Sequence, residues 1–339
     1  MSITNTDWHN RPYYTLDAWC KNQFHYKCYK VALNAHMNCP NRDGSIGTRG
    51  CIFCSEGGSG EFAVDIRGLD IQKQLNEGIR RIADKLPDTS FEKPCIIAYF
   101  QAYTNTYAPL PYLKEVFTEA LSCPMVLGIS VATRPDCLPG EVIGLLSALK
   151  EAFPEKFIWI ELGLQTIHGQ TAAYIRRGYP LSCFETACRA LSLARIPTIV
   201  HVILGLPNET REQMYETVRY VNAIRPFGVK FQLLHVLAGT DLAADYAAGQ
   251  FQTLTKEAYL DIVIRCLELL SPEITVHRVT GDGPKDILIA PDWSRNKKDV
   301  LNSLHALMKE RHTHQGLSYQ EPSPQYSEDN HVTGSIDTL

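Results

Sequence analysis

Six apolar runs rich in β-branched residues, separated by amphipathic segments, constrain the fold of this 339-residue chain more than any other feature. Each run is almost continuously hydrophobic, as expected of parallel strands that are buried on both faces. Alternation of strands and helices predicts a parallel α/β fold. The predicted strands are residues 28–37, 95–101, 125–134, 157–165, 198–206 and 229–236.

The segments between these runs have helical periodicity. Leu75, Ile79 and Ile82 recur at spacings of four and three, and Thr210 with Gln213 forms a capping-box pattern that predicts the start of a later helix. Six strand–helix units favour a partial TIM-like (βα)6 barrel over a closed eight-stranded barrel. An open, doubly wound sheet fits the same periodicity.

The pattern changes after about residue 250, where a predicted helix (255–270), a strand (273–279) and a helix near 294–310 follow. We interpret this region as a small extension that packs against the barrel. The last residues are polar, which is typical of a disordered tail. The predicted parts are an N-terminal arm (1–27), the barrel (28–250), a C-terminal extension that closes it (251–312) and the tail (313–339).

Composition narrows the class of protein. The net charge is −4, so no global basic field indicates nucleic acid. The N-terminus has no signal-peptide pattern, and no run approaches the ~18 apolar residues of a membrane span. We therefore expect a cytoplasmic protein, whose thiols stay reduced. Its eleven cysteines then point to metal or redox chemistry rather than to disulfides.

Three cysteines lie in the stretch CPNRDGSIGTRGCIFC that follows the first predicted strand. A structural zinc site usually takes four ligands in two close pairs, whereas here Cys51 and Cys54 form one pair and Cys39 stands alone. His36 is a conceivable fourth ligand, but its spacing matches no common zinc finger. Three thiolates suit a [4Fe–4S] cluster with one open iron, because such a cube normally takes four. A non-catalytic iron–sulfur or zinc-binding protein remains the alternative.

Polar or glycine-containing residues follow the apolar runs. In parallel α/β folds the carboxyl ends of the strands share one face, where active sites lie. The cysteine stretch also follows a strand end, so we expect it to lie on the same face. The other polar endings are residues 101–105, 133–136, 165–166, 205–207 and 238–240.

The residues Cys51–Ile52–Phe53–Cys54, with a cysteine upstream, resemble the cluster loop of the radical S-adenosylmethionine (SAM) superfamily. The usual spacing there is C-x3-C-x2-C, and the C-x11-C-x2-C spacing here is similar to the long first gap of the elongator catalytic subunit. From about residue 15 to 310 the chain resembles the YhcC/YtqA-like branch. The segments that carry this resemblance are CPNRDGSIGTRGCIFCSEGGSGEF, YFQAYTNTYAP, ATRPDCL, ELGLQT, HVILGLP and HRVTGDGP.

The resemblance implies a partial barrel and a [4Fe–4S] cluster ligated by Cys39, Cys51 and Cys54, with SAM on the open iron. It also implies reductive cleavage of SAM to a 5′-deoxyadenosyl radical that takes hydrogen from a substrate, and an electron donor such as flavodoxin or ferredoxin. A tRNA nucleoside is one candidate substrate because the spacing and HRVTGDGP are elongator-like; a small molecule or peptide is another. Basic residues that could serve tRNA or simply form solvated faces are Lys21, Lys27, Lys30, Arg295, Lys297 and Lys298.

Further cofactor contacts follow where positions match the family. Phe53 is expected to pack against the cofactor or the cluster edge. Gln101, Tyr103 and Thr104 match the Gly-rich segment that receives the methionyl amine in oxygen-independent coproporphyrinogen oxidases, although no glycine is present here. For each contact, a structural hydrogen bond at a strand end is the alternative.

The later strands supply other expected contacts. A glutamate often found on the third strand matches Ala132, so Thr133 or Arg134 is expected to take its place. Gln165 is a candidate for the ribose hydroxyls and Arg177 matches a family arginine. His201 stands where relatives have an aspartate on the fifth strand. Arg278 and Asp282 of HRVTGDGP are expected at one edge of the site. Cys183 and Cys188 do not complete the ligand set of a second cluster.

Overall fold

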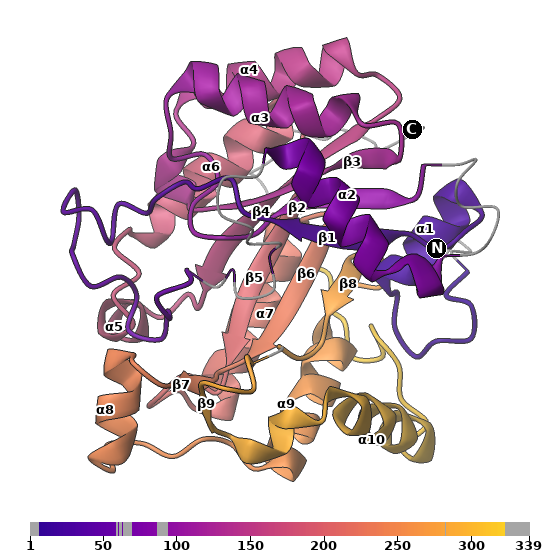
Figure 1. Ribbon diagram of the computed structural model, residues 1–339. Helices are drawn as coiled ribbons and strands as arrows, with labels where there is room; N and C mark the ends of the chain where they lie inside the picture. The colour runs from indigo at the N-terminus through magenta and orange to yellow at the C-terminus, as the bar shows by residue number, and fades with distance from the viewer. Residues whose placement is uncertain are drawn as a thin grey trace. The chain divides into compact units, whose positions relative to one another are not determined.

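The computed structural model describes residues 7–58, 60, 63, 70–86, 94–281 and 283–322 (Figure 1). The strands are β1 (Tyr29–Leu33), β2 (Ile96–Phe100), β3 (Val126–Thr133), β4 (Phe157–Gln165), β5 (Thr198–Leu204), β6 (Gly228–Leu233), β7 (Val236–Leu237), β8 (Thr275–Arg278) and β9 (Leu288–Ala290). Seven of them form a sheet in the order β1-β2-β3-β4-β5-β6-β8, and β7 pairs with β9. The predicted α/β fold class is thus confirmed.

The helices alternate with the strands as the sequence predicts. None of the helices in the described residues is long and apolar enough to span a membrane. The α-helices are α1 (Leu16–Phe24), α2 (Ile71–Arg81), α3 (Leu110–Ser122), α4 (Gly140–Ala152), α5 (Gly169–Tyr174), α6 (Leu181–Leu193), α7 (Arg211–Ile224), α8 (Asp241–Ala247), α9 (Lys256–Leu269) and α10 (Lys297–Glu310).

The chain divides into two compact units. The cysteine unit comprises residues 27–163 and 178–198 and contains the Cys39–Cys54 stretch. The second unit comprises, among the described residues, 7–26, 164–177 and 199–322. Each unit has its own sheet segment and helices, and we describe them in turn.

In the cysteine unit, helices pack on one face of β1–β3. Gly78 of α2 approaches Val31 so closely that a Cβ at position 78 would overlap the valine side chain. The Phe100 ring meets Phe117 of α3 edge-on, with centroids 5.1 Å apart. Since side chains alternate along a strand, Lys30 and Tyr99 point to the opposite face of the sheet segment. Figure 1 shows α3 and α4 side by side above this sheet segment.

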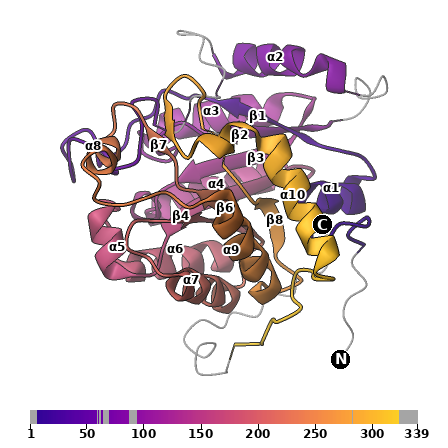
Figure 2. The same cartoon turned by 90° about the horizontal axis from the view of Figure 1, so that it is seen from below.

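In the second unit, β5, β6 and β8 are parallel neighbours. Helix α7 begins with the predicted capping box, in which Thr210 and Gln213 each satisfy the other's backbone amide. Helices α7 and α9 lie side by side (Figure 2). Strand β8 comes from the region that the sequence assigns to the C-terminal extension, yet it pairs with β6 as a further strand of the sheet.

Two predicted strands end three or more residues before their apolar runs do. The run 28–37 leaves the sheet after Leu33 because Gln74 of α2 takes both backbone groups of Asn34: its Oε1 accepts from the Asn34 amide at 2.9 Å and its Nε2 donates to the carbonyl at 2.8 Å. The run 229–236 ends at Leu233, and Val236 begins the separate pair β7–β9.

Part of the predicted tail belongs to the second unit. Gln315 is 1% exposed, accepts from the backbone amide of Tyr14 and donates to the carbonyls of Ser271 and Ile274. The N-terminal arm is joined to the same unit, since the amide of Val276 donates to the carbonyl of Tyr14 at 2.7 Å. Residues 323–339 lie outside the described residues.

Candidate functional site

The three cysteines of the predicted cluster lie on the irregular loop between β1 and α2. Cys39, Cys51 and Cys54 are not in disulfides, and all three are half-buried. The loop is shaped by backbone turns: the Gly50 amide donates to the carbonyl of Asn41 at 2.7 Å, and the Cys54 amide to that of Cys51 at 3.0 Å. His36, the conceivable fourth zinc ligand, is exposed.

The three sulfurs share one electrostatic environment. Burial raises the pKa of the Cys51 thiol to about 12, with further contributions from Cys54 and Cys39. Arg134 and a hydrogen bond from Asn41, whose Nδ2 lies 3.5 Å from the Cys51 sulfur, oppose this rise. A free thiol in this position keeps its proton, and a bound metal displaces it.

This donor set fits an iron–sulfur cluster. In the described part of the chain, no three His, Cys, Asp or Glu side chains are gathered closely enough to hold a single metal ion. A tetrahedral zinc ion needs all its ligands within about 2.0–2.3 Å of one atom, whereas a [4Fe–4S] cube takes each thiolate on a different iron. Three half-buried thiols on one loop can each ligate one iron of such a cube and leave the fourth iron open.

The glycines after Cys54 are needed because the end of β2 packs directly on them. Gly58 has φ +60°, and a Cβ at this position would overlap the ring of Tyr103; one at Gly60 would overlap the side chain of Ala102. The Tyr103 amide donates to the Gly58 carbonyl at 2.9 Å and its hydroxyl donates to the Glu56 carbonyl. The stretch 55–58 is thus fitted to the predicted cofactor segment, and residue 59 lies outside the described residues.

The segment Gln101–Thr104 contains no glycine, yet one of its residues has a backbone conformation typical of glycine. Tyr103 has φ +60°, a conformation that side chains other than glycine seldom adopt. Thr104 is buried, and its amide points to the carbonyl of Asn38 in the cysteine loop at 3.3 Å. Gln101 is half-buried at the end of β2, and Phe53 is half-buried within the loop.

The end of β3 brings Arg134 to the cysteines. Its guanidinium is held by Asp136 through two hydrogen bonds of 2.9 and 2.6 Å and lies 4.8 Å from the ring centroid of Tyr179. It acts electrostatically on Cys51. The neighbouring Thr133 is buried, and its hydroxyl pairs with that of Thr106 at 2.5 Å.

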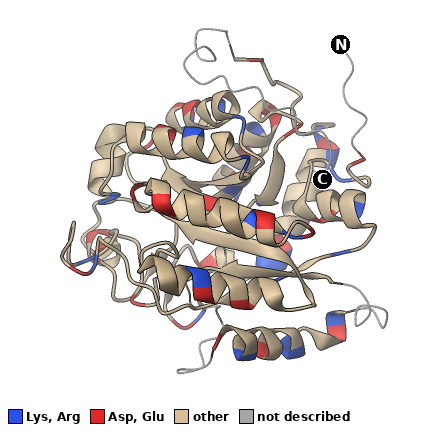
Figure 3. Ribbon diagram, turned by 90° about the horizontal axis from the view of Figure 1, so that it is seen from above, with Lys and Arg blue, Asp and Glu red and all other residues tan. Residues whose placement is uncertain are grey.

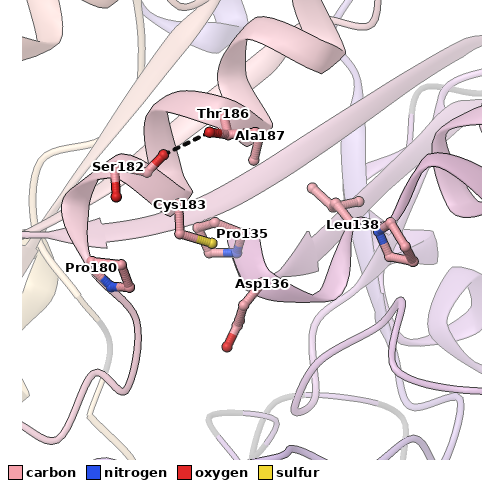
Figure 4. Close-up of a pocket in the computed structure, with 9 residues that line it drawn as sticks. Pro135, Asp136, Leu138, Pro180, Ser182, Cys183, Thr186 and Ala187 are labelled. Atoms are coloured by element: carbon pink, nitrogen blue, oxygen red, sulfur yellow. Dashed lines mark hydrogen bonds between the residues drawn. The ribbon is translucent and has the colours of Figure 1, made fainter.

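A pocket of about 430 Å³ lies beside this ion pair, between the segment after β3 and the start of α6 (Figure 4). In the figure the Cys183 sulfur points toward Pro135 and Asp136. Cys188, five residues further along the same helix, is buried, and burial raises the pKa of its thiol. The pocket is lined by Pro135, Asp136, Leu138, Pro139, Pro180, Ser182, Cys183, Thr186 and Ala187.

In the second unit, Gln165 ends β4 with an unusual backbone and an unsatisfied side chain. Its φ is +65°, and its Oε1 is buried without a hydrogen-bond partner among the described residues. Arg177 is 3% exposed, and its Nη1 donates to the carbonyls of Leu164 and Thr166, at 2.9 and 2.7 Å. Arg177 therefore fixes the backbone on both sides of Gln165 and leaves the buried amide oxygen available to a ligand hydroxyl.

Other predicted residues have different surroundings. His201 on β5 is half-buried, with Nδ1 3.0 Å from Nε2 of Gln232 on β6. Arg278 is half-buried at the end of β8, and Asp282 lies outside the described residues. Arg295 is bound to Asp292 and to backbone carbonyls of its own region, so it is a structural residue as well as a basic one.

The grouping of Lys30 with solvated basic residues is wrong. Lys30 lies on the face of the sheet segment opposite α2 and α3, where its Nζ is 2.8 Å from Oε1 of Glu161 and 4.9 Å from the ring centroid of Tyr99. Ser130 donates to the same carboxylate oxygen at 2.6 Å, and the Glu161 side chain is fully buried. The sequence gives only a weak signal of this cluster, a glutamate within the apolar run FIWIELGLQ.

Arg42 is a second residue that the sequence does not single out. Its Nη2 donates to the carbonyls of Cys54 and Ser55, and its guanidinium lies 5.7 Å from the ring centroid of Tyr103. It also interacts electrostatically with Cys54 and Cys39. The cysteine loop therefore has two cations beside its sulfurs, Arg42 and Arg134.

Comparisons with known proteins agree with this geometry. Residues 44–221 match the radical SAM superfamily and residues 226–310 its C-terminal domain. The chain is 41% identical over 308 residues to YtqA of Bacillus subtilis (strain 168), covering 91% of this chain and 93% of the relative. It is 30% identical over 296 residues to YhcC of Escherichia coli (strain K12), covering 87% and 92%.

A solved structure is similar in fold. The archaeal Elp3 of Methanocaldococcus infernus, with an N-terminal deletion, superposes with a TM-score of 0.63 at 14% identity, covering 85% of this chain and 65% of that chain. At this identity the likeness concerns the fold, and it confirms the predicted partial TIM-like barrel. On the sequence matches, the chain belongs to the radical SAM superfamily, in the branch of YtqA and YhcC that is related to the elongator catalytic subunit.

Proposed function

We propose that this chain is a radical SAM enzyme whose [4Fe–4S] cluster is held by Cys39, Cys51 and Cys54. The observation that carries the proposal is that three half-buried cysteines outside any disulfide lie on one loop, where Cys51 interacts electrostatically with Cys54, Arg134 and Cys39. Thiolates on a cluster accumulate negative charge, and a neighbouring guanidinium offsets it. When bound, the cluster supplies the electron that cleaves SAM to the 5′-deoxyadenosyl radical.

The residues around the loop have separable roles in this proposal. Asn41 donates toward the Cys51 sulfur and orients that thiolate. Arg134 is fixed by Asp136, which leaves its charge facing the cysteines without freedom to swing away. Gly58 lets the chain pass close to Tyr103, so that the loop and the end of β2 form one continuous wall.

Gln165 supports a SAM-binding role over the non-catalytic alternative. A buried amide oxygen with no partner costs free energy, roughly 1–3 kcal/mol, unless a ligand satisfies it. We propose that a ribose hydroxyl of SAM donates to this oxygen. Arg177 contributes indirectly, by holding the carbonyls on either side of Gln165. An electron-transfer or zinc-binding protein binds no SAM, so it would have no ligand hydroxyl to satisfy the Oε1 of Gln165.

The substrate is proposed only as a class. A tRNA nucleoside follows from the elongator-like spacing and from HRVTGDGP, and a small molecule or peptide is the other candidate. Figure 3 shows basic and acidic residues interspersed on the helices of the face in view. The nucleosides of tRNA from cells with and without the protein, compared by mass spectrometry, separate the two: an unchanged profile removes tRNA from consideration.

The enzymatic proposal is tested by product formation. Anaerobically reconstituted protein is mixed with dithionite and SAM, and 5′-deoxyadenosine is measured by chromatography. We expect release of 5′-deoxyadenosine by the wild-type chain and none by Cys54→Ala. Cys266→Ala is the matched control, because Cys266 is buried in α9 of the second unit and should not affect cleavage. Absence of 5′-deoxyadenosine from protein with a full cluster would favour the non-catalytic alternative.

A further inference from the structure

Backbone hydrogen bonds join the two ends of the eleven-residue segment between Cys39 and Cys51. The Gly50 amide donates to the Asn41 carbonyl at 2.7 Å, and the amides of Ile46 and Gly47 both donate to the Pro40 carbonyl, at 2.8 and 3.2 Å. Residues 42–49 therefore form a closed excursion, a segment whose two ends are joined by hydrogen bonds at residues 40–41 and 46–50. Without them, only Pro40, Asn41 and Gly50 would separate the two cysteines, which is the C-x3-C spacing usual in the superfamily.

One side chain joins this excursion to the third cysteine. Arg42 is its first residue, and its Nη2 donates to the carbonyls of Cys54 (2.9 Å) and Ser55. Its guanidinium packs against Gly50, where a Cβ would lie 2.9 Å from Nε, and against the Tyr103 ring. Arg42 thus contacts Gly50 at the base of the excursion, the backbone of Cys54 and Ser55, and Tyr103 after the end of β2.

The charge of Arg42 lies beside a proposed cluster ligand. The guanidinium is half-buried, and its Nη2 is 2.9 Å from the backbone carbonyl of Cys54. At a partly buried site such an interaction is screened less than at the surface. A fixed positive charge there favours the state of the cluster that carries one more electron, because cluster potentials depend on nearby charge.

We infer that Arg42 is a positioning residue: it holds the closed excursion so that C-x11-C-x2-C has the geometry of C-x3-C-x2-C, and its charge raises the reduction potential of the cluster. This inference rests on the proposed cluster. It extends the proposal to a residue of this chain that neither the cysteine spacing nor the strand-end pattern identifies.

The test uses three variants of the full chain, reconstituted anaerobically: Arg42→Gln, Arg42→Lys and Arg49→Gln. Arg49 lies in the same excursion but is exposed, so its variant controls for loss of a charge from this segment. Iron and sulfide per chain, the rate of iron loss to a chelator and the midpoint potential by EPR-monitored titration are measured. Thermal unfolding shows that each variant is folded.

We expect Arg42→Gln to lose iron about tenfold faster than wild type, since two charge-assisted hydrogen bonds are removed, and to shift the potential to a more negative value. Arg42→Lys should restore the potential but not the retention of iron, because an ammonium lacks the planar fork of arginine. Arg49→Gln should match wild type in both. If Arg42→Gln does not fold, Arg42→Lys still distinguishes the effect of the positive charge from the effect of the guanidinium's hydrogen-bond geometry.

Failure of the inference and failure of the proposed function have different signatures. If wild-type protein binds no iron–sulfur cluster, the proposed function is wrong. If wild type binds a cluster and Arg42→Gln equals Arg49→Gln in both iron retention and potential, the inference is overturned while the cluster stands. If Arg42→Gln loses iron faster but keeps the wild-type reduction potential, the claim that Arg42 raises the potential is overturned. If Arg42→Gln retains iron as wild type does, the claim that Arg42 positions the loop is overturned.

Discussion

The sheet segment β1–β4 and the cysteine loop that follows β1 are adjacent in sequence and are held in different ways. Side chains of the sheet such as Leu33 and Phe100, and Phe117 of the helix α3 packed on it, are fully buried. The loop has no strand or α-helix from Asn34 to Gly58, and turns, glycines and Arg42 determine its path. Burial of apolar area stabilises the first, and a few polar contacts stabilise the second. Changes in the loop should therefore affect the site and spare the fold.

The largest effect is expected for Cys54→Ala. Removal of one of three thiolates should abolish the cluster, so iron per chain should fall to background. The free energy of unfolding of the metal-free chain should change by no more than about 1 kcal/mol, because Cys54 is half-buried and makes no disulfide. Iron analysis and denaturant unfolding measure the two quantities. A variant that unfolds would show that the loop supports the sheet.

Lys30→Met tests the sheet side of the comparison. This change removes the ammonium that lies 2.8 Å from the fully buried carboxylate of Glu161. Removal of one partner of a buried ion pair costs about 3–5 kcal/mol, and we expect about 3 kcal/mol because the Lys30 side chain is 21% exposed. Lys27→Met, at an exposed position, is the control. Equal unfolding free energies for the two variants would contradict a structural role for the pair.

Gly58→Ala against Gly44→Ala separates backbone strain from steric overlap within the loop. Both glycines have positive φ, but a Cβ at Gly58 would overlap the Tyr103 ring, whereas a Cβ at Gly44 would have nothing within 4 Å. We expect a cost of about 1 kcal/mol for Gly44→Ala and roughly 2 kcal/mol or more for Gly58→Ala. Only Gly58→Ala should slow cluster assembly. Identical assembly rates would show that contact with Tyr103 does not shape the site.

Gln165→Ala should have the smallest effect. If its Oε1 accepts from SAM, the affinity of the reconstituted protein for SAM should fall by up to about tenfold, since a net hydrogen bond contributes about 0.5–1.5 kcal/mol. The metal-free fold should be unchanged or slightly stabilised, because a buried unsatisfied oxygen is removed. Gln170→Ala, at an exposed position in α5, is the control in equilibrium binding of SAM. Equal affinities in the two variants would remove Gln165 from the binding site.

The difference between apolar burial in the sheet and polar contacts in the loop also explains which features could be predicted from the sequence. Apolar runs report burial directly, so every predicted strand is present in the sheet, and the run 28–37 extends too far because Gln74 ends the ladder after Leu33. The capping box of α7 could be predicted because its two residues are three positions apart in the sequence. The cluster role of the three cysteines could be proposed because their spacing on one loop indicates a set of metal ligands.

Contacts made between distant segments could not be predicted. Lys30 appears on the sequence as one more surface lysine, and only the register of β1 to β4 brings it to Glu161, 131 positions away. Arg42 reaches Cys54 because residues 42–49 fold back on themselves, which spacing alone does not show. The role of Arg177 likewise depends on which carbonyls it contacts.

The most direct test of the account is EPR spectroscopy of the reduced, reconstituted protein with and without SAM. If Cys39, Cys51 and Cys54 hold a cube with one open iron, SAM binds at that iron. We then expect one [4Fe–4S]⁺ signal per chain, with g values that change when SAM is added. A signal that SAM leaves unchanged, or purified protein with one tetrahedral zinc ion in place of iron and sulfide, would contradict the account.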